Sequence, residues 1–189
     1  MRLAITGPQN TGKTTFLKDF LLAFPHYFSF KRTYRDIIRE NKLKVNREAT
    51  ENGQRLIRDF LYRQIKENKK KNVIFDRCVL DNWVYSYYQY EAGKFSEVFI
   101  KESEKIMFDS LKYLDALIFI PAGISIPLTK EYLRDTDAFF IDDINRLFIS
   151  KIIDIARKSK IKIIVICGNR KDRIKQIRKF ITSKNGEKS

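Results

Sequence analysis

The chain has 189 residues, which is enough for one α/β domain and too short for two of typical size. Hydrophobic residues make up 43% of the chain and there are only 7 glycines and 4 prolines, so collagen-like and disordered chains are excluded. The 38 basic and 23 acidic side chains give a formal net charge of +15, which predicts an anionic partner such as a nucleotide, a nucleic acid or an acidic surface.

The first predicted element is a strand over residues 2–6. It starts directly after Met1, which leaves no room for a signal peptide, and no apolar run approaches the ~20 residues that span a bilayer. We therefore expect a cytoplasmic protein without membrane contact. Cys78 and Cys167 form no CxxC pair and His26 is the only histidine, so the sequence predicts neither a disulfide framework nor a zinc site.

Four more apolar, β-branched runs predict buried strands of a parallel sheet, because each precedes a stretch of crossover length; they cover residues 27–30, 72–75, 116–120 and 161–167. Hydrophobic residues at helical spacing predict helices over residues 14–24, 33–42, 47–68, 81–90, 96–114, 138–157 and 170–181. Strands that alternate with helices indicate right-handed crossovers and a doubly wound α/β fold. We expect one domain over residues 1–182 and a flexible polar tail at 183–189.

The strongest motif lies between the first strand and the first helix. Residues 7–14 read Gly-Pro-Gln-Asn-Thr-Gly-Lys-Thr, a full match to G-x-x-x-x-G-K-[ST]. Glycines let the backbone fold around an anion with its N–H groups inward, and the helix N-terminus adds partial positive charge. Lys13 can reach the β- and γ-phosphates, and the Thr14 hydroxyl can ligate Mg²⁺. The motif predicts a nucleoside triphosphate site built from Gly7, Asn10, Thr11, Gly12, Lys13, Thr14 and Thr15.

An acidic and a basic residue, Asp76 and Arg77, follow the predicted strand 72–75. Ligands of open α/β sheets bind outside the carboxyl ends of the strands, so Asp76 should face the same crevice as the phosphate loop. It can hold Mg²⁺ through water, or it can accept the proton of an attacking hydroxyl. Arg77 can bind a substrate phosphate or the transferring group through bidentate bonds. The alternative is that Asp76 caps a helix and Arg77 is a surface residue.

These motifs resemble the nucleoside and nucleotide kinase group of P-loop proteins, which includes thymidylate kinase and deoxynucleoside kinases. The run FDRCVLDNWVY at 75–85 and the segment TYRDIIR at 33–39 are more similar to the AAA-like ATPase/kinase family typified by the ribosylnicotinamide kinase domain of the NadR proteins. The resemblance implies a P-loop NTPase fold whose five-stranded parallel sheet has the strand order 2-3-1-4-5. It also implies ATP with Mg²⁺ and phosphoryl transfer to a small hydroxyl or phosphate acceptor.

In kinases of this kind, the segment that corresponds to residues 121–137 carries a lid whose basic residues close over the phosphates. The transition state spreads charge over the γ-phosphoryl oxygens, and a cation brought in by a lid stabilises it while water is excluded. We expect Arg134 to be that cation, with Lys130 as the second candidate. The alternative is that Arg134 and the neighbouring Asp135 are ordinary surface charges.

The acceptor is expected between the ends of the second and third strands. Arg35, Asp36 and Asp81 are the candidate substrate-binding residues, although Asp81 is equally placed to cap its helix; Gln54 and Arg58 are weaker candidates. Aromatic side chains fill the helix 81–90 and offer surfaces for base stacking, but a stripe at helical spacing is more often core.

The base of ATP is expected near the exit of the last strand. Gly168 permits a tight turn there, Arg170 can stack its planar guanidinium on adenine, and Arg173 follows one turn later. The alternative is an ordinary strand-to-helix turn.

The sequence thus predicts an ATP-dependent kinase that acts on a nucleoside, a nucleotide or a related small metabolite. A polynucleotide 5′-hydroxyl kinase uses the same parts and would explain the positive charge, but the basic residues are scattered along the chain. A nucleotide-dependent switch or ATPase without an acceptor is the third interpretation. The chain lacks the Asn/Thr-Lys-x-Asp motif of ordinary GTPases.

Overall fold

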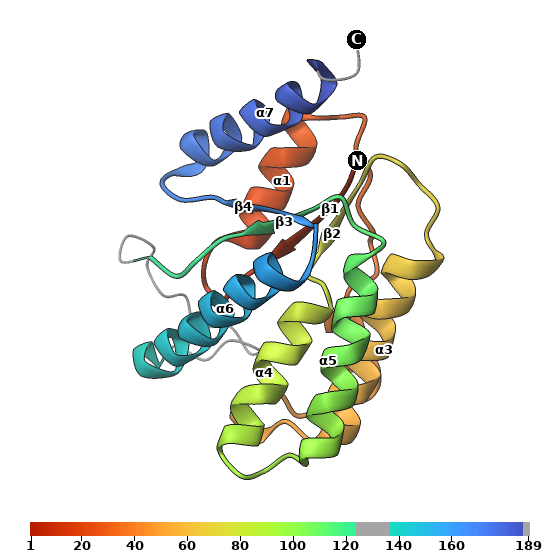
Figure 1. Ribbon diagram of the computed structural model, residues 1–189, viewed down its shortest axis with the longest axis vertical. Helices are drawn as coiled ribbons and strands as arrows, with labels where there is room; N and C mark the ends of the chain where they lie inside the picture. Colours follow the sequence, from red (N-terminus) through yellow and green to blue (C-terminus); the bar gives the residue numbers. More distant parts are fainter. Residues whose placement is uncertain (124–136, 187–189) are drawn as a thin grey trace.

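The computed structural model describes residues 1–123 and 137–186, and a parallel β-sheet forms its centre (Figure 1). The strands follow the order β2-β1-β3-β4, with bounds β1 (Arg2–Thr6), β2 (Val73–Asp76), β3 (Ala116–Phe119) and β4 (Lys162–Val165). The register pairs Ile5 of β1 with Asp76 on one side and with Ile118 on the other. The α/β class with a parallel sheet is therefore confirmed.

Helices surround the sheet, and each lies close to a segment that hydrophobic spacing predicted. Their bounds are α1 (Lys13–Ala23), α2 (Tyr34–Glu40), α3 (Glu51–Glu67), α4 (Val79–Glu91), α5 (Glu97–Leu111), α6 (Ala138–Lys158) and α7 (Arg170–Gly186), and a 3₁₀ turn, η1 (Asn46–Glu48), precedes α3. Residues 187–189 of the predicted tail lie outside the described residues.

Two hydrophobic cores lie on opposite faces of the sheet, because successive side chains of a strand point to opposite sides. Leu3 and Ile5 pack in the core formed with α1 and α7, whereas Ala4 and Phe75 belong to the core under α3, α4, α5 and α6 (Figure 1). Burial of the strands on both faces explains their continuous apolar runs. Among the described residues, no helix combines the length and the hydrophobicity that crossing a bilayer requires.

The prediction of five strands is wrong, because the segment 27–30 does not form a strand. Only Phe28 pairs with the sheet: its N–H donates to Asn72 O at 2.9 Å, and its carbonyl accepts from Ile74 N at 2.9 Å. Phe30 instead stacks on Phe75, with ring centroids 5.8 Å apart. These aromatic residues therefore serve ring packing beside β2, and the other four strands keep the relative order that was predicted.

The start of the phosphate loop lies against β3, and this close approach requires a glycine. Gly7 has φ +138°, and a Cβ built on it would lie 2.3 Å from Ile120 O. We expect Gly7→Ala to lower the free energy of unfolding by about 2–4 kcal/mol, because strained φ adds to a backbone clash. Urea denaturation measures this loss.

The control is Gly93→Ala, since Gly93 also has a positive φ, +72°, but nothing lies within 4 Å of its added Cβ. This variant should lose only about 1–2 kcal/mol, the cost of a left-handed alanine. Equal losses for the two variants would contradict a role for the contact with Ile120.

Candidate functional site

The loop of residues 7–12 connects β1 to α1 and encloses the side chain of Lys13. Gly12 is the N-cap of α1 with φ +76°, and the first turn of this helix contains no acidic residue. Lys13 is 5% exposed, and its ammonium donates to Pro8 O and, at 2.9 Å, to Thr11 Oγ1. A helix N-terminus and a buried ammonium thus meet in one loop, which is the arrangement that binds polyphosphate.

Asp76 and Arg77 lie beside this loop at the carboxyl end of β2. Asp76 is the register partner of Ile5, two residues before Gly7, and is half-buried. Arg77 adopts φ +83°, and its N–H donates to Ile5 O at 3.1 Å. A left-handed backbone at a residue other than glycine costs about 1–3 kcal/mol and is maintained only where surrounding contacts impose it.

The side chains of Arg77 and Asp81 supply such contacts and join α4 to the phosphate loop. Arg77 Nη1 donates to Gly7 O at 2.7 Å and to Asp81 Oδ1 at 2.5 Å, and Asp81 also accepts from Gly7 N at 3.3 Å. Burial acts against the charge of Arg77, but Tyr34 and Asp81 outweigh it and raise the pKa of its guanidinium well above the usual value. Asp81 also forms a capping box with Cys78, which is the capping alternative expected for this residue.

Tyr85, one helical turn beyond Asp81, makes a second link from α4 to the loop. Its hydroxyl accepts from Gln9 N and donates to Gln9 Oε1, both at 3.1 Å. Burial raises the pKa of Tyr85 to about 12, so the phenol stays protonated near neutral pH. Sequence reasoning missed this contact. The available signal was the i, i+4 spacing to Asp81, which places both side chains on one face of α4.

On the opposite side of the loop, α7 supplies two arginines. Arg173 Nη1 donates to Thr11 O at 2.7 Å, a contact that the sequence did not predict. Arg170, the candidate for stacking on adenine, forms a bidentate ion pair with Asp19 of α1 at 2.6 and 2.8 Å. The guanidinium of Arg170 therefore joins α7 to α1.

The two candidates on α2 have different environments. Asp36 caps its own helix by accepting from Thr33 N at 2.7 Å, and this hydrogen bond holds the pKa of its carboxyl below the usual value. Asp36 also pairs with Arg39. Arg35 lies over the ring of Tyr34, 5.6 Å from its centroid, and Arg77 lies 5.7 Å from the same centroid. Both guanidinium groups thus contact the ring of Tyr34.

A polar seam of uncharged side chains, Gln54, Asn82, Ser86 and Gln89, is buried between α3 and α4. Each of these residues is at most 5% exposed. Asn82 Nδ2 donates to Gln54 O at 2.9 Å and to Gln54 Oε1 at 2.6 Å. Within the described residues, Asn82 Oδ1, Ser86 Oγ and Gln89 Oε1 have no hydrogen-bond partner. Buried polar atoms without a partner cost about 1–3 kcal/mol each, so this seam has unused capacity for hydrogen bonds.

Arg58 and the aromatic residues of α4 belong to the packed interior. Arg58 donates to Ser103 Oγ at 3.1 Å and pairs with Glu102 at 3.2 Å, so its charge is already balanced. Trp83 is buried and stacks on Tyr87 with centroids 4.7 Å apart. The interpretation of the α4 aromatic residues as core is confirmed.

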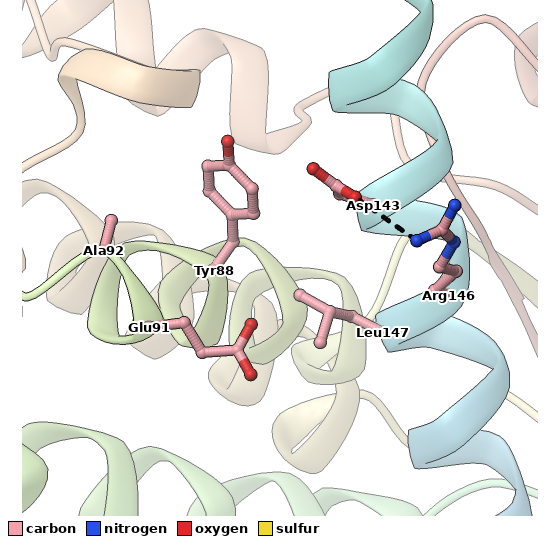
Figure 2. Close-up of a pocket in the computed structure, with 6 residues that line it drawn as sticks. All are labelled: Tyr88, Glu91, Ala92, Asp143, Arg146 and Leu147. Atoms are coloured by element: carbon pink, nitrogen blue, oxygen red, sulfur yellow. Dashed lines mark ion pairs between the residues drawn. The ribbon is translucent and has the colours of Figure 1, made fainter.

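A cavity of about 350 Å³ lies between α4 and α6 (Figure 2). Arg146 of α6 forms ion pairs with Asp142 at 2.6 Å and, more weakly, with Asp143 at 3.9 Å. None of the predicted site residues lines this cavity, whose lining consists of Tyr88, Glu91, Ala92, Asp143, Arg146 and Leu147.

Thr14 and Asp76 are the residues available to hold Mg²⁺. Thr14 follows Lys13 at the start of α1, and Asp76 ends the strand beside β1. A hydroxyl and a carboxylate are hard oxygen donors, which suit Mg²⁺ when water completes its coordination. Residues 1–123 and 137–186 contain no cluster of three or more His, Cys, Asp or Glu side chains that could hold a metal ion without such help. Arg134 and Lys130 lie outside the described residues.

Comparison with known proteins places this geometry in a family. A family model described as an AAA domain matches residues 2–173. Deoxyadenosine kinase from M. mycoides has a TM-score of 0.71 at 16% identity, over 97% of this chain and 99% of that chain. Thymidylate kinase from Candida albicans has a TM-score of 0.64 at 17% identity, over 97% and 91% of the two chains.

A NadR protein in complex with NR has a TM-score of 0.69 at 12% identity, over 94% of this chain and 50% of that chain. No curated protein sequence matches. At these identities the structural likeness establishes a shared fold.

Proposed function

Since the chain belongs to the AAA domain family, as the match over residues 2–173 shows, we propose that it is an ATP-dependent kinase. It transfers the γ-phosphoryl group to the hydroxyl of a small, uncharged acceptor of the nucleoside type. Among the similar solved structures, deoxyadenosine kinase supports a nucleoside acceptor. Thymidylate kinase supports phosphoryl transfer in general, because its acceptor is a nucleotide.

The observation that carries the proposal is the position of Asp76 beside the phosphate loop. Asp76 pairs in register with Ile5 of the strand that leads into Gly7, and Arg77 is hydrogen-bonded to the Gly7 carbonyl. A carboxylate at this place can meet a hydroxyl that approaches the terminal phosphate. A carboxylate at this place can also hold Mg²⁺ for a nucleotide switch, so the test of the proposal is transfer of the phosphoryl group to an acceptor.

The chemistry assigns a separate task to each residue. Lys13 leaves its contacts with Pro8 and Thr11 and binds the β- and γ-phosphate oxygens. The acceptor oxygen then attacks the γ-phosphorus, the bond to the β–γ bridging oxygen breaks, and ADP leaves. The hydroxyl proton passes to the carboxylate of Asp76. Mg²⁺, held by Thr14 and by Asp76 through water, would neutralise phosphate charge when bound.

Arg77 acts in this proposal through the backbone. Its Nη1 donates to the Gly7 carbonyl and to the Asp81 carboxylate. These bonds orient the phosphate loop and stabilise the left-handed backbone of Arg77, which follows Asp76. A cation from the segment 121–137, for which Arg134 is the candidate, completes the charge stabilisation.

The polar seam supports an uncharged acceptor. Its orphan oxygens on Asn82, Ser86 and Gln89 lie on the helix that follows Asp76 and Arg77. Amide and hydroxyl groups match the edge of a base or the hydroxyls of a sugar, and the adjacent Arg58 already has Glu102 as its partner. The Gln54–Asn82 hydrogen bond is exchanged for bonds to the acceptor, which also satisfies the orphan atoms.

A transfer panel tests the proposal. The purified chain is incubated with Mg²⁺, γ-labelled ATP and single acceptors: nucleosides, nucleoside monophosphates and a 5′-hydroxyl oligonucleotide. Label is expected on a nucleoside. Label on the oligonucleotide alone would assign a polynucleotide kinase, and binding of ATP without label on any acceptor would contradict the kinase proposal.

Truncation of the seam is expected to weaken acceptor binding selectively. Asn82→Ala removes the amide that bonds Gln54, so KM for the acceptor should rise about tenfold while KM for ATP stays within twofold. Steady-state kinetics with the best acceptor of the panel measures both constants. Gln64→Ala is the control, because it truncates another amide of α3 that does not belong to the polar seam. Gln64 Nε2 donates to Arg32 O at 3.0 Å. Equal effects on both KM values would contradict the acceptor role of the seam.

A further inference from the structure

Arg173 of α7 carries a buried charge that reaches the phosphate loop from behind. The residue is 8% exposed, and its side chain donates to Thr11 O at 2.7 Å and to Gly168 O at 2.9 Å. Both acceptors are neutral carbonyls. Within the described part of the chain, no carboxylate forms an ion pair with this guanidinium.

A buried charge without a counter-charge is unfavourable, which distinguishes Arg173 from the buried basic residues outside the phosphate loop. Arg58, Arg77 and Lys151 each pair with at least one carboxylate. Burial lowers the pKa of Arg173 below its usual value, as expected for a cation whose surroundings do not balance it. Such a group is stabilised when an anion binds nearby, and Thr11 belongs to the loop that is built for anions.

The hydrogen bond to Thr11 also sets the direction of a backbone donor. The carbonyl of one residue and the N–H of the next point in opposite directions across a trans peptide, and the described chain contains no cis peptide bond. Because Thr11 O points at Arg173, the Gly12 N–H points away from α7. A backbone N–H directed in this way is available to a phosphate oxygen bound by the loop.

The junction between β4 and α7 holds Arg173 in place. Gly168 turns the chain with φ +85°, and the backbone N–H of Arg173 donates to Asn169 O at 3.0 Å. One turn earlier, Arg170 joins α7 to Asp19 of α1, the helix that continues from the loop. The loop, the start of α1 and the start of α7 thus form one hydrogen-bonded unit.

We propose that Arg173 is a positioning residue for polyphosphate: it fixes the Thr11–Gly12 peptide so that its N–H faces the loop interior, and its charge is balanced by the bound phosphates. This inference rests on the nucleotide-binding part of the proposed function. It concerns binding rather than transfer, so it is tested without any acceptor.

The test compares Arg173→Gln with Arg178→Gln, which removes an exposed arginine from the same helix. Arg178 lies over the Phe24 ring, 5.1 Å from its centroid. Calorimetric titration of the full chain with MgATP, well below the unfolding temperature, is expected to give at least a tenfold higher Kd for Arg173→Gln. Arg178→Gln should stay within twofold. Arg173→Lys, which keeps the charge, should recover affinity to within about threefold of the wild type.

Two results would overturn the proposal. One is a folded Arg173→Gln variant that binds MgATP within twofold of the wild type. The other is an Arg173→Lys variant as weak as Arg173→Gln with an equally lowered melting temperature, which would assign a purely structural role. If Arg173→Gln does not fold, the Nε–H resonance of Arg173 in the wild type decides: it is expected to shift with MgATP and not with adenosine. Absence of phosphoryl transfer would contradict the kinase alone.

Discussion

Lys13→Ala is expected to lower the turnover of phosphoryl transfer by about 10³-fold. The ammonium of Lys13 is buried inside the loop, and in the proposed reaction it stabilises the charge that accumulates on the γ-phosphoryl oxygens in the transition state. Initial rates with γ-labelled ATP and the best acceptor of the panel measure this loss.

The fold should survive this change. Thr11 Oγ1 still donates to Pro8 O at 3.1 Å, so the loop keeps an internal hydrogen bond without the ammonium. Lys18→Ala, on the exposed side of α1, is the control and should keep its turnover within twofold. A folded Lys13→Ala protein with the activity of the wild type would remove the loop from the reaction.

Asp76→Asn is expected to lower kcat by about 10³-fold as well, because an amide neither accepts the hydroxyl proton nor carries the charge of the base. The two roles of Asp76 differ in their effect on binding. If the carboxylate acts on the acceptor, Kd for MgATP stays within about threefold; if it mainly holds the metal, affinity falls in the presence of Mg²⁺ and not in its absence. Titration with and without Mg²⁺ separates them.

Asp115→Asn is the matched control for this variant. Asp115 directly precedes β3, at the amino ends of the strands, whereas Asp76 lies at the carboxyl end of β2. The Asp115 carboxylate accepts from Arg2 N at 2.7 Å, and the amide oxygen of asparagine can accept the same bond. Its turnover should be unchanged. Undiminished kcat in Asp76→Asn would exclude Asp76 from the site.

Local patterns predicted those parts of the molecule that depend on neighbours in sequence. The phosphate loop is a contiguous motif between an apolar run and a periodic helix, so its position follows from spacing alone. The capping of α4 by Asp81, one of the two roles expected for this residue, is likewise a local relation. The prediction of a strand over residues 27–30 was wrong because aromatic residues that pack beside β2, as Phe30 does on Phe75, have the same apolar composition as a buried strand.

Contacts between distant segments were beyond such patterns. Arg173 meets Thr11 across 162 positions, and Arg170 meets Asp19 across 151. The sequence placed Arg170 near the base of ATP, but it indicated neither Asp19 nor Thr11 as the partner of these arginines. Only the packing of α7 beside α1 gives them their partners. The polar seam was equally hidden, because its capacity comes from atoms that lack a partner after α3 and α4 have packed.

The attachment of α4 to Gly7 and Gln9 has a thermodynamic consequence: the affinities for ATP and for the acceptor become coupled. Asp81 and Tyr85 make these bonds, and the same helix carries the seam at Asn82. An acceptor that stabilises the position of α4 therefore also stabilises the loop and raises its affinity for ATP. Thermodynamic linkage then requires ATP to raise the affinity for the acceptor by the same factor. Such coupling is typically about 5–150-fold, which favours the ternary complex over either binary one and limits the time that bound ATP is exposed to water alone.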